Sequence, residues 1–114
     1  MGDVKAGYLE AEKTVVSDGA DTGVPFFGTE TKVNVGAFVR ASLNVVVSAA
    51  GASITVNGYK TANATADVLY AKTALSAGNN IVLNAFNVEP YVYIEVLEHA
   101  VTATQSQTCY LSAK

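Results

Sequence analysis

Two carboxylates in a glycine-rich stretch have the composition of a calcium loop. Asp18 and Asp21 stand three residues apart in DGADTG, and calcium prefers hard oxygen ligands from a flexible loop. An EF-hand loop also needs a third oxygen ligand, a closing glutamate and flanking helices, and the sequence offers none of these. We therefore interpret this stretch as a solvated loop and expect no metal site in it.

A second group of acids surrounds the only histidine of the chain. Glu95 and His99 would share one face of a strand, whereas Glu98 would point to the other face. Catalytic zinc needs three converging protein ligands, so one pair is not enough. Glu10 and Glu12 could line one face of a strand as in glycosidases, but two acids near the N-terminus of so small a chain rarely make a cleft.

The parts of a nucleophilic site are also missing from the sequence. There is one histidine for many Ser and Thr residues, and no G-x-S-x-G elbow, P-loop or G-x-G-x-x-G follows a strand. Cys109, the single cysteine, lies in the strand-like stretch TCYL and is interpreted as a small buried hydrophobe. We expect no catalytic residue, no metal, no cofactor and no enzymatic activity.

Aromatic side chains indicate a binding surface. Phe26 and Phe27 are adjacent in a glycine-flanked loop, so one can enter the core while the other anchors an interface. Tyr91 and Tyr93 share a strand face opposite an apolar stripe, where amphipathic rings favour interfaces. We predict these four as interface residues. The alternative function is a carbohydrate-binding module or similar ligand-binding sandwich, in which Tyr91, Tyr93 or Tyr59 stacks on sugar rings.

The segment 33–47 carries the strongest secondary-structure signal. Every odd position in it is apolar, namely Val33, Val35, Ala37, Val39, Ala41, Leu43, Val45 and Val47. A period of two predicts a strand with one face in the core. Such a strand would be about 50 Å long at ~3.3 Å per residue, so we expect a bend or bulge at Gly36.

Shorter segments show the same alternation. Strands are predicted within 4–9, 14–17, 52–56, 81–88, 91–101 and 108–113. Residues 49–51 are interpreted as a hairpin connection, Asn57-Gly58 as a type I′ turn, and residues 18–28 as the longest loop. The stretch 65–77 fits a strand at 67–73 followed by a loop, or a helix, and we favour the strand.

These segments predict one all-β domain over residues 1–114. Seven to nine short strands with regular turns and no secure helix are typical of an antiparallel β-sandwich, with jelly-roll or Greek-key connections. Residues 1–31 hold six of the ten acids and the weakest strand signals. We expect residues 1–12 to form an arm or edge strand that contacts a partner subunit, the alternative being pairing within their own sheet.

Composition limits the classes of partner. The net charge is −3 and the seven basic residues are dispersed, so no basic stripe is available for nucleic acid. Apolar runs fall far below the ~20 residues of a membrane span, and the polar N-terminus is not typical of a signal peptide. Only 15% of residues are charged, and many are Thr, Ser, Asn and Ala. We expect protein partners, and neither nucleic acid nor membrane.

In composition and strand rhythm the whole chain resembles the small β-sandwich structural proteins of tailed-phage particles. The likeness consists of few cysteines, an acidic balance and abundant Ala, Val, Thr and Gly, without a diagnostic motif. It implies a bacteriophage virion subunit, either a capsid-decoration (cement) protein or a minor head or tail protein, made in the host cytoplasm. It also implies binding to itself and to a major capsid or other virion protein, as a homo-oligomer with a trimer favoured.

Overall fold

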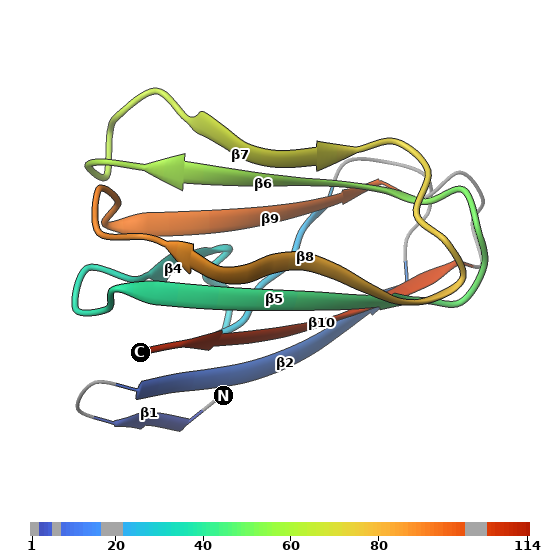
Figure 1. Ribbon diagram of the computed structural model, residues 1–114, viewed down its shortest axis with the longest axis horizontal. Coiled ribbons are helices and arrows are strands. Elements are labelled where there is room, and N and C mark those ends of the chain that lie inside the picture. The colour runs from blue at the N-terminus through green and yellow to red at the C-terminus, as the bar shows by residue number, and fades with distance from the viewer. Residues whose placement is uncertain (1–2, 6–7, 17–21, 100–104) are drawn as a thin grey trace.

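The chain folds into strands joined by turns (Figure 1). The computed structural model describes residues 3–5, 8–16, 22–99 and 105–114, and these residues contain ten strands and no helix. The strands are β1 (Asp3–Lys5), β2 (Tyr8–Val16), β3 (Thr22–Gly23), β4 (Lys32–Asn34), β5 (Arg40–Val47), β6 (Ser53–Tyr59), β7 (Asp67–Lys72), β8 (Gly78–Asn87), β9 (Tyr93–His99) and β10 (Ser106–Ala113).

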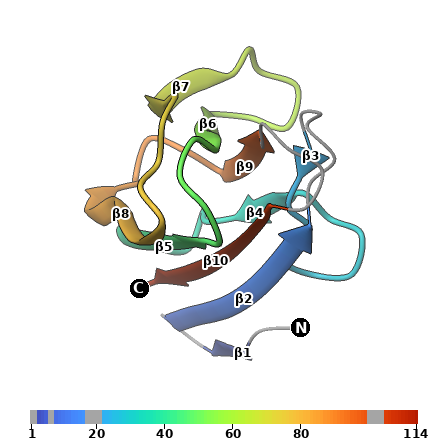
Figure 2. The same cartoon turned by 90° about the vertical axis from the view of Figure 1, so that its right-hand side faces the viewer.

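The strands form two antiparallel sheets that pack face to face. Sheet A has the order β1-β2-β10-β5-β8, and sheet B has the order β3-β9-β6-β7 with β4 also paired to β9. Figure 2 shows the two sheets as separate layers with the core between them. The predicted antiparallel β-sandwich is confirmed.

The strand pairs are nested in the sequence. β2 pairs with β10, β4 with β9, β5 with β8, and β6 with β7, so that each pair lies between the strands of the previous pair along the chain. A long hairpin rolled over itself gives this pattern, which is the jelly roll.

β1 pairs with β2 at one edge of sheet A, and the contact of residues 1–12 with a partner subunit stays a prediction. β3 lies inside the predicted loop 18–28 and brings the strand number to ten, above the expected seven to nine.

The predicted long strand 33–47 is divided between the sheets. β4 belongs to sheet B and β5 to sheet A, and a turn over Gly36 and Ala37 joins them, where the bend was expected. Most of the odd positions are buried as predicted, but Ala37 in the turn and Val39 after it are exposed. The period of two ends at the turn because the chain changes sheets there.

The predicted hairpin at residues 49–51 is wrong. β5 lies in sheet A and β6 in sheet B, so the connection crosses from one layer to the other instead of joining paired strands. β5 pairs with β8 and β10, and β6 pairs with β7 and β9. Leu75 closes this end of the core, because its backbone exchanges hydrogen bonds with Gly51 and Ala52 and its side chain is buried.

The predicted turn at Asn57-Gly58 is also wrong, because both residues lie inside β6. β6 carries a register shift at Asn57 where it pairs with β7. A Cβ atom at Gly58 would lie 2.7 Å from a ring carbon of Tyr91, so the missing side chain lets the tyrosine ring pack against the strand. Gly58 therefore allows the Tyr91 ring to approach the strand closely, and it does not form a turn.

The predicted strand 4–9 is wrong, because its two ends belong to β1 and β2, and β2 continues into the strand predicted at 14–17. The other strand predictions agree with the structure. β7 ends at Lys72 and is followed by a loop, which confirms the strand interpretation of 67–73. β8, β9 and β10 cover most of the segments predicted at 81–88, 91–101 and 108–113. The core between the sheets is aliphatic, and its largest fully buried apolar side chains are Leu43, Ile54, Leu75, Ile94, Leu111, Val24, Val33, Val35, Val45 and Val56.

Candidate interaction surfaces

The outer face of sheet A presents uncharged side chains along the middle of β5, β8 and β10. Alternation along β5 and β10 turns Leu43 and Leu111 into the core and their neighbours outward. Register places Tyr110, Asn44 and Ile81 in one row across β10, β5 and β8. We call this surface the sheet A outer face and define it by Ser42, Asn44, Val46, Asn79, Ile81, Thr108, Tyr110 and Ser112.

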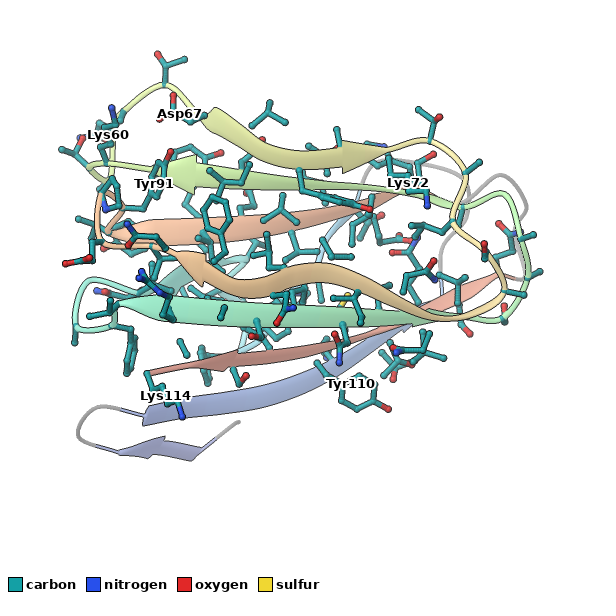
Figure 3. All side chains as sticks on the ribbon, viewed as in Figure 1. Lys60, Asp67, Lys72, Tyr91, Tyr110 and Lys114 are labelled. Carbon is teal, nitrogen blue, oxygen red and sulfur yellow. The ribbon has the colours of Figure 1, made fainter. Side chains whose placement is uncertain are left out.

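Three apolar side chains on this face are accessible to water. Ile81 is 63% exposed, Tyr110 43% and Val46 36%. Figure 3 shows Tyr110 projecting on the side of sheet A away from β6 and β9. Burying such side chains against a partner is favourable, at about 25 cal/mol per Å² of apolar area. The sheet A outer face can therefore bind another protein through apolar and small uncharged side chains.

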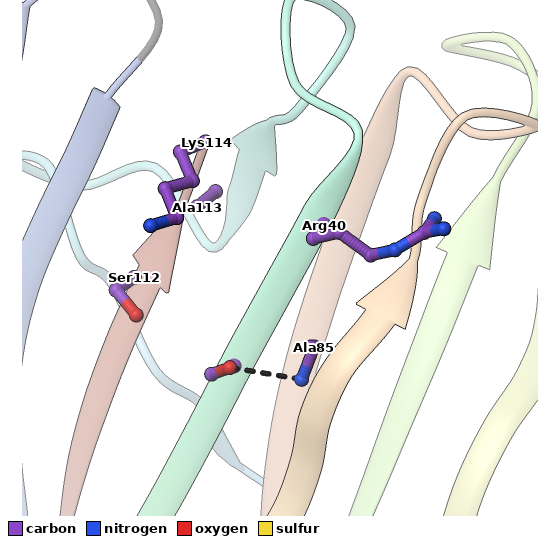
Figure 4. Close-up of a pocket in the computed structure, with 6 residues that line it drawn as sticks. Arg40, Ala85, Ser112, Ala113 and Lys114 are labelled. Atoms are coloured by element: carbon purple, nitrogen blue, oxygen red, sulfur yellow. Dashed lines mark hydrogen bonds between the residues drawn. The ribbon is translucent and has the colours of Figure 1, made fainter.

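One end of the sheet A outer face is hollowed and carries positive charge. A hollow of about 300 Å³ is lined by Arg40, Ser42, Ala85, Ser112, Ala113 and Lys114. Ala85 has a positive φ of 49° and donates its backbone N–H to Ser42 Oγ over 2.9 Å. Arg40 and Lys114 point to opposite sides of the hollow (Figure 4). Its six lining residues include no carboxylate side chain, histidine or cysteine.

Polar contacts surround Tyr59 on the outer face of sheet B. The hydroxyl of Tyr59 donates a 2.7 Å hydrogen bond to Glu95 Oε1, and Thr31 Oγ1 donates to Glu95 Oε2 over 3.5 Å. Lys32 Nζ lies 4.0 Å from the centroid of the Tyr59 ring. The hydrogen bond to Glu95, followed by burial, raises the pKa of Tyr59. The Tyr59 ring is thus covered by a cation and is not an open platform for a sugar.

The structure separates the two tyrosines that were predicted to share a face. Tyr93 lies in β9 opposite Tyr59, on the outer face of sheet B. Tyr91 precedes the strand and packs against the core over Gly58. Burial, followed by the charge of Asp67, raises the pKa of Tyr91, and Figure 3 shows both residues at the same end of the sandwich. The prediction that Tyr91 and Tyr93 share a strand face is therefore wrong, because β9 and its alternation begin only at Tyr93.

Both Phe26 and Phe27 pack in or against the core. Phe26 is a buried core residue, as the interpretation of one inward ring required. Phe27 is half-buried and packs against the same core. Burial removes Phe26 from the accessible surface of the single chain. An interface role for Phe27 and Tyr93 stays a prediction.

The predicted acidic groups do not assemble into a site in the described part of the chain. Glu98 is buried between the sheets, while Glu95 and His99 lie on the opposite side of β9, as predicted. His99 Nε2 lies 3.3 Å from Thr55 Oγ1. Among the described residues, no three His, Cys, Asp or Glu side chains are grouped so as to hold a metal ion. The loop acids at positions 18 and 21 lie outside the described residues.

The sequence interpretation did not predict that two polar side chains are buried inside the sandwich. Glu98 and Gln107 are fully buried, and Gln107 Nε2 donates to the Ser53 carbonyl over 3.0 Å. Glu98 follows Ile94 and Val96 at steps of two, so the alternation of β9 already placed it inward. Cys109 is buried too, which confirms its interpretation. Burial, and then the charge of Glu98, raises the pKa of its thiol to about 12.

Comparisons with known proteins support the fold. No protein-family model and no curated protein matches the chain. The solved structure of the SPBc2 prophage-derived protein YomS is similar, with a TM-score of 0.55 and 11% identity over 98% of this chain and 99% of that one. The two proteins therefore share a fold along their whole length.

A plant cysteine peptidase, Peruvianin-I from Thevetia peruviana latex, gives a weaker match. It covers 94% of this chain and 50% of the peptidase, with 18% identity and a TM-score of 0.40. We base no argument on a similarity of that size. Among the described residues, none belongs to a helix with the length and apolar character that a membrane span requires.

Proposed function

We propose that this protein is a non-enzymatic structural subunit of a bacteriophage particle, either a capsid-decoration protein or a minor head or tail protein. The observation that carries the proposal is the similarity to a prophage-derived protein over 98% of this chain and 99% of its neighbour. Two proteins of matching length and fold, one of them prophage-derived, favour a phage origin for the other. The proposed location is the virion, after synthesis in the host cytoplasm.

The surface of the fold supports a role in binding protein. Jelly rolls are common in viral capsid and lectin domains. The sheet A outer face offers exposed apolar side chains among small uncharged ones, which suits contact with a major capsid or other virion protein. The accessible features described above provide a binding surface more readily than a reaction centre.

A carbohydrate-binding module is the less favoured alternative. Such a module needs aromatic rings whose faces are open to a sugar. Lys32 covers Tyr59, and Tyr91 packs against the core, so only Tyr93 of the three predicted platforms is left. We therefore prefer the structural subunit.

The proposal is tested by following the protein through particle purification. Particles from a host that carries the gene are separated on a density gradient, and fractions are probed with an antibody raised against the purified chain. We expect the protein to sediment with intact particles. Recovery only in the slowly sedimenting fractions, while a known capsid protein is found in the particle band, would contradict a virion role.

A further inference from the structure

Two cations lie side by side at one end of sheet A. Arg40 on β5 and Lys114 after β10 exchange backbone hydrogen bonds of 3.0 Å, so they are neighbours in the sheet. Both residues are exposed. In the described part of the chain one ion pair occurs, between Lys60 and Asp67, and it includes neither of these cations. Neighbouring cations repel each other, and an anion bound between them relieves that repulsion.

The hollow between these cations has room for one ligand group. Side chains two residues apart on a strand share a face, so Ser42 stands beside Arg40 and Ser112 beside Lys114. Because the serine and alanine side chains of the lining are small, they leave a hollow of about 300 Å³, at the lower end of the range for ligand pockets. Figure 4 shows Arg40 and Lys114 on its two sides. A small anionic group placed there meets a cation on each side.

One residue of the lining has a strained backbone. Ala85 has a φ of 49°, and no other non-glycine residue in the described part of the chain has a positive φ. It belongs to a bulge of β8, where Asn84 and Ala85 both stand opposite Ser42. Ser42 Oγ accepts the N–H of Ala85 over 2.9 Å, which leaves the hydroxyl proton of Ser42 to donate. Bulges and strained residues are frequent beside binding sites, and this bulge fixes a hydroxyl donor in the lining of the hollow.

We propose that this hollow binds the carboxylate of an acidic side chain from a partner protein. A carboxylate matches the planar fork of the arginine guanidinium, while Lys114 adds a second charge and Ser42 a hydroxyl donor. A protein presents the carboxylate, because the next row of the same face holds the exposed Tyr110 and Ile81, which a protein would cover. The site goes beyond the proposed virion role, since the isolated chain carries it, and only the identity of the partner rests on that role.

One acidic residue borders the hollow in the strand order. Glu10 of β2 pairs with Ser112 of β10, which places it on the side away from β5. A negative charge there opposes an incoming carboxylate, and at roughly 8 Å through water it lowers the affinity about twofold. Arg40 and Lys114 belong to the lining itself, whereas β2 contributes none of its described residues to it. The hollow therefore attracts one carboxylate, and removing the charge of Glu10 should strengthen binding.

The test is a nuclear magnetic resonance titration of the isolated, isotope-labelled protein at low salt, where surface charges are least screened. The probe is the capped peptide acetyl-Ala-Glu-Ala-amide. We expect saturable shifts of the amide signals of Ser42, Ala85 and Ser112, with a dissociation constant in the millimolar range. The neutral peptide acetyl-Ala-Gln-Ala-amide should give no such shifts, because it lacks the charge. Acetate should bind more weakly than the acidic peptide, and equal binding would overturn the assignment to a protein side chain.

Three variants locate the binding. Arg40→Gln should weaken binding of the acidic peptide about tenfold, because charge-assisted hydrogen bonds are lost. Glu10→Gln should strengthen it about twofold through the loss of the opposing charge. Lys72→Gln is the matched control, since it removes an exposed cation on β7 of sheet B, and it should change the dissociation constant by less than about twofold.

The melting temperature of each variant shows whether it is folded. If Arg40→Gln fails to fold, Lys114→Gln takes its place and should weaken binding severalfold. The proposal would be overturned by the absence of saturable shifts, by equal binding of the acidic and neutral peptides, by equal effects of Arg40→Gln and Lys72→Gln, or by weaker binding to Glu10→Gln. The titration uses no particle, so its failure is independent of the test for a virion role.

Discussion

At the scale of single residues, the interior contains two fully buried polar side chains and the only thiol of the chain. Glu98 and Gln107 are fully buried within an aliphatic core, and the charge of Glu98 adds to burial in raising the pKa of Cys109. The thiol is therefore held protonated in the folded protein, well above the pH at which an exposed cysteine ionises. Cys109 consequently packs as a hydrophobe and is a poor nucleophile at neutral pH.

The Cys109 pKa of about 12 predicts how stability depends on pH. Below about pH 8.5, the pKa of an exposed cysteine, the thiol is protonated in both states and contributes no slope. Between that value and about 12 the unfolded thiol loses its proton while the folded thiol keeps it, so stability falls as pH rises. One proton gives a slope of at most about 1.4 kcal/mol per pH unit. Urea unfolding at a series of pH values should show a steeper alkaline loss for the parent than for Cys109→Ala, and equal slopes would contradict this account.

Leu43 tests whether the inward face of β5 is assigned correctly. It is fully buried between Ala41 and Val45, which are also core residues. Leu43→Ala should cost roughly 2–5 kcal/mol of unfolding free energy through lost burial and a cavity. Val46→Ala on the opposite face of the same strand should cost less than about 1 kcal/mol. Denaturant titration of both variants at the same protein concentration measures the difference, and similar losses would mean that the two faces are exchanged.

At the scale of elements, β6 depends on glycine where it passes under an aromatic ring. Gly58→Ala would bring a Cβ to 2.7 Å from the Tyr91 ring, so the ring or the strand must move. Overpacking of this kind costs about 1–3 kcal/mol. Tyr91→Ala removes the obstacle, and adding Gly58→Ala to it should then cost clearly less. A double-mutant cycle from thermal unfolding measures the coupling, and additive effects would show that the close approach is not what requires glycine.

The two N-terminal strands, β1 and β2, differ in how many residues pair with the rest of sheet A. β2 pairs with β10 over eight register positions, whereas β1 pairs only with β2 over three. Deletion of residues 1–5 should therefore leave the melting temperature within a few degrees. Deletion of residues 1–12 should lower it by about ten degrees or more, which corresponds to roughly 2 kcal/mol for a domain of this size. Thermal unfolding distinguishes these outcomes, and an unchanged temperature after the longer deletion would make the segment a detached arm.

Local pattern predicted the elements better than their pairing. The period of two in 33–47 identified the buried side chains of β4 and β5, because alternation is a property of each strand alone. The hairpin at 49–51 was wrong because apolar alternation does not say which sheet a strand joins. Asn57-Gly58 has the composition of a turn, but the Tyr91 ring that explains the glycine lies more than thirty residues away.

At the scale of the whole molecule, the candidate surface could not be read from the sequence. Tyr110, Asn44 and Ile81 come from three strands far apart in the chain, and only the rolled topology sets them in one row. The predicted aromatic anchors depended on local reasoning, and packing moved Phe26 and Tyr91 into or against the core. The jelly roll thus packs Phe26 and Tyr91 into or against the core and brings Tyr110, Asn44 and Ile81 together from three distant strands.

The most direct test of the central claim is the copy number of this protein in purified particles. Quantitative mass spectrometry with isotope-labelled peptides would compare it with the major capsid protein after extensive washing. A structural subunit should be present in a fixed ratio from one preparation to another, and absent from particles made without the gene. A trace amount that varies between preparations and falls with each wash would contradict the proposed role.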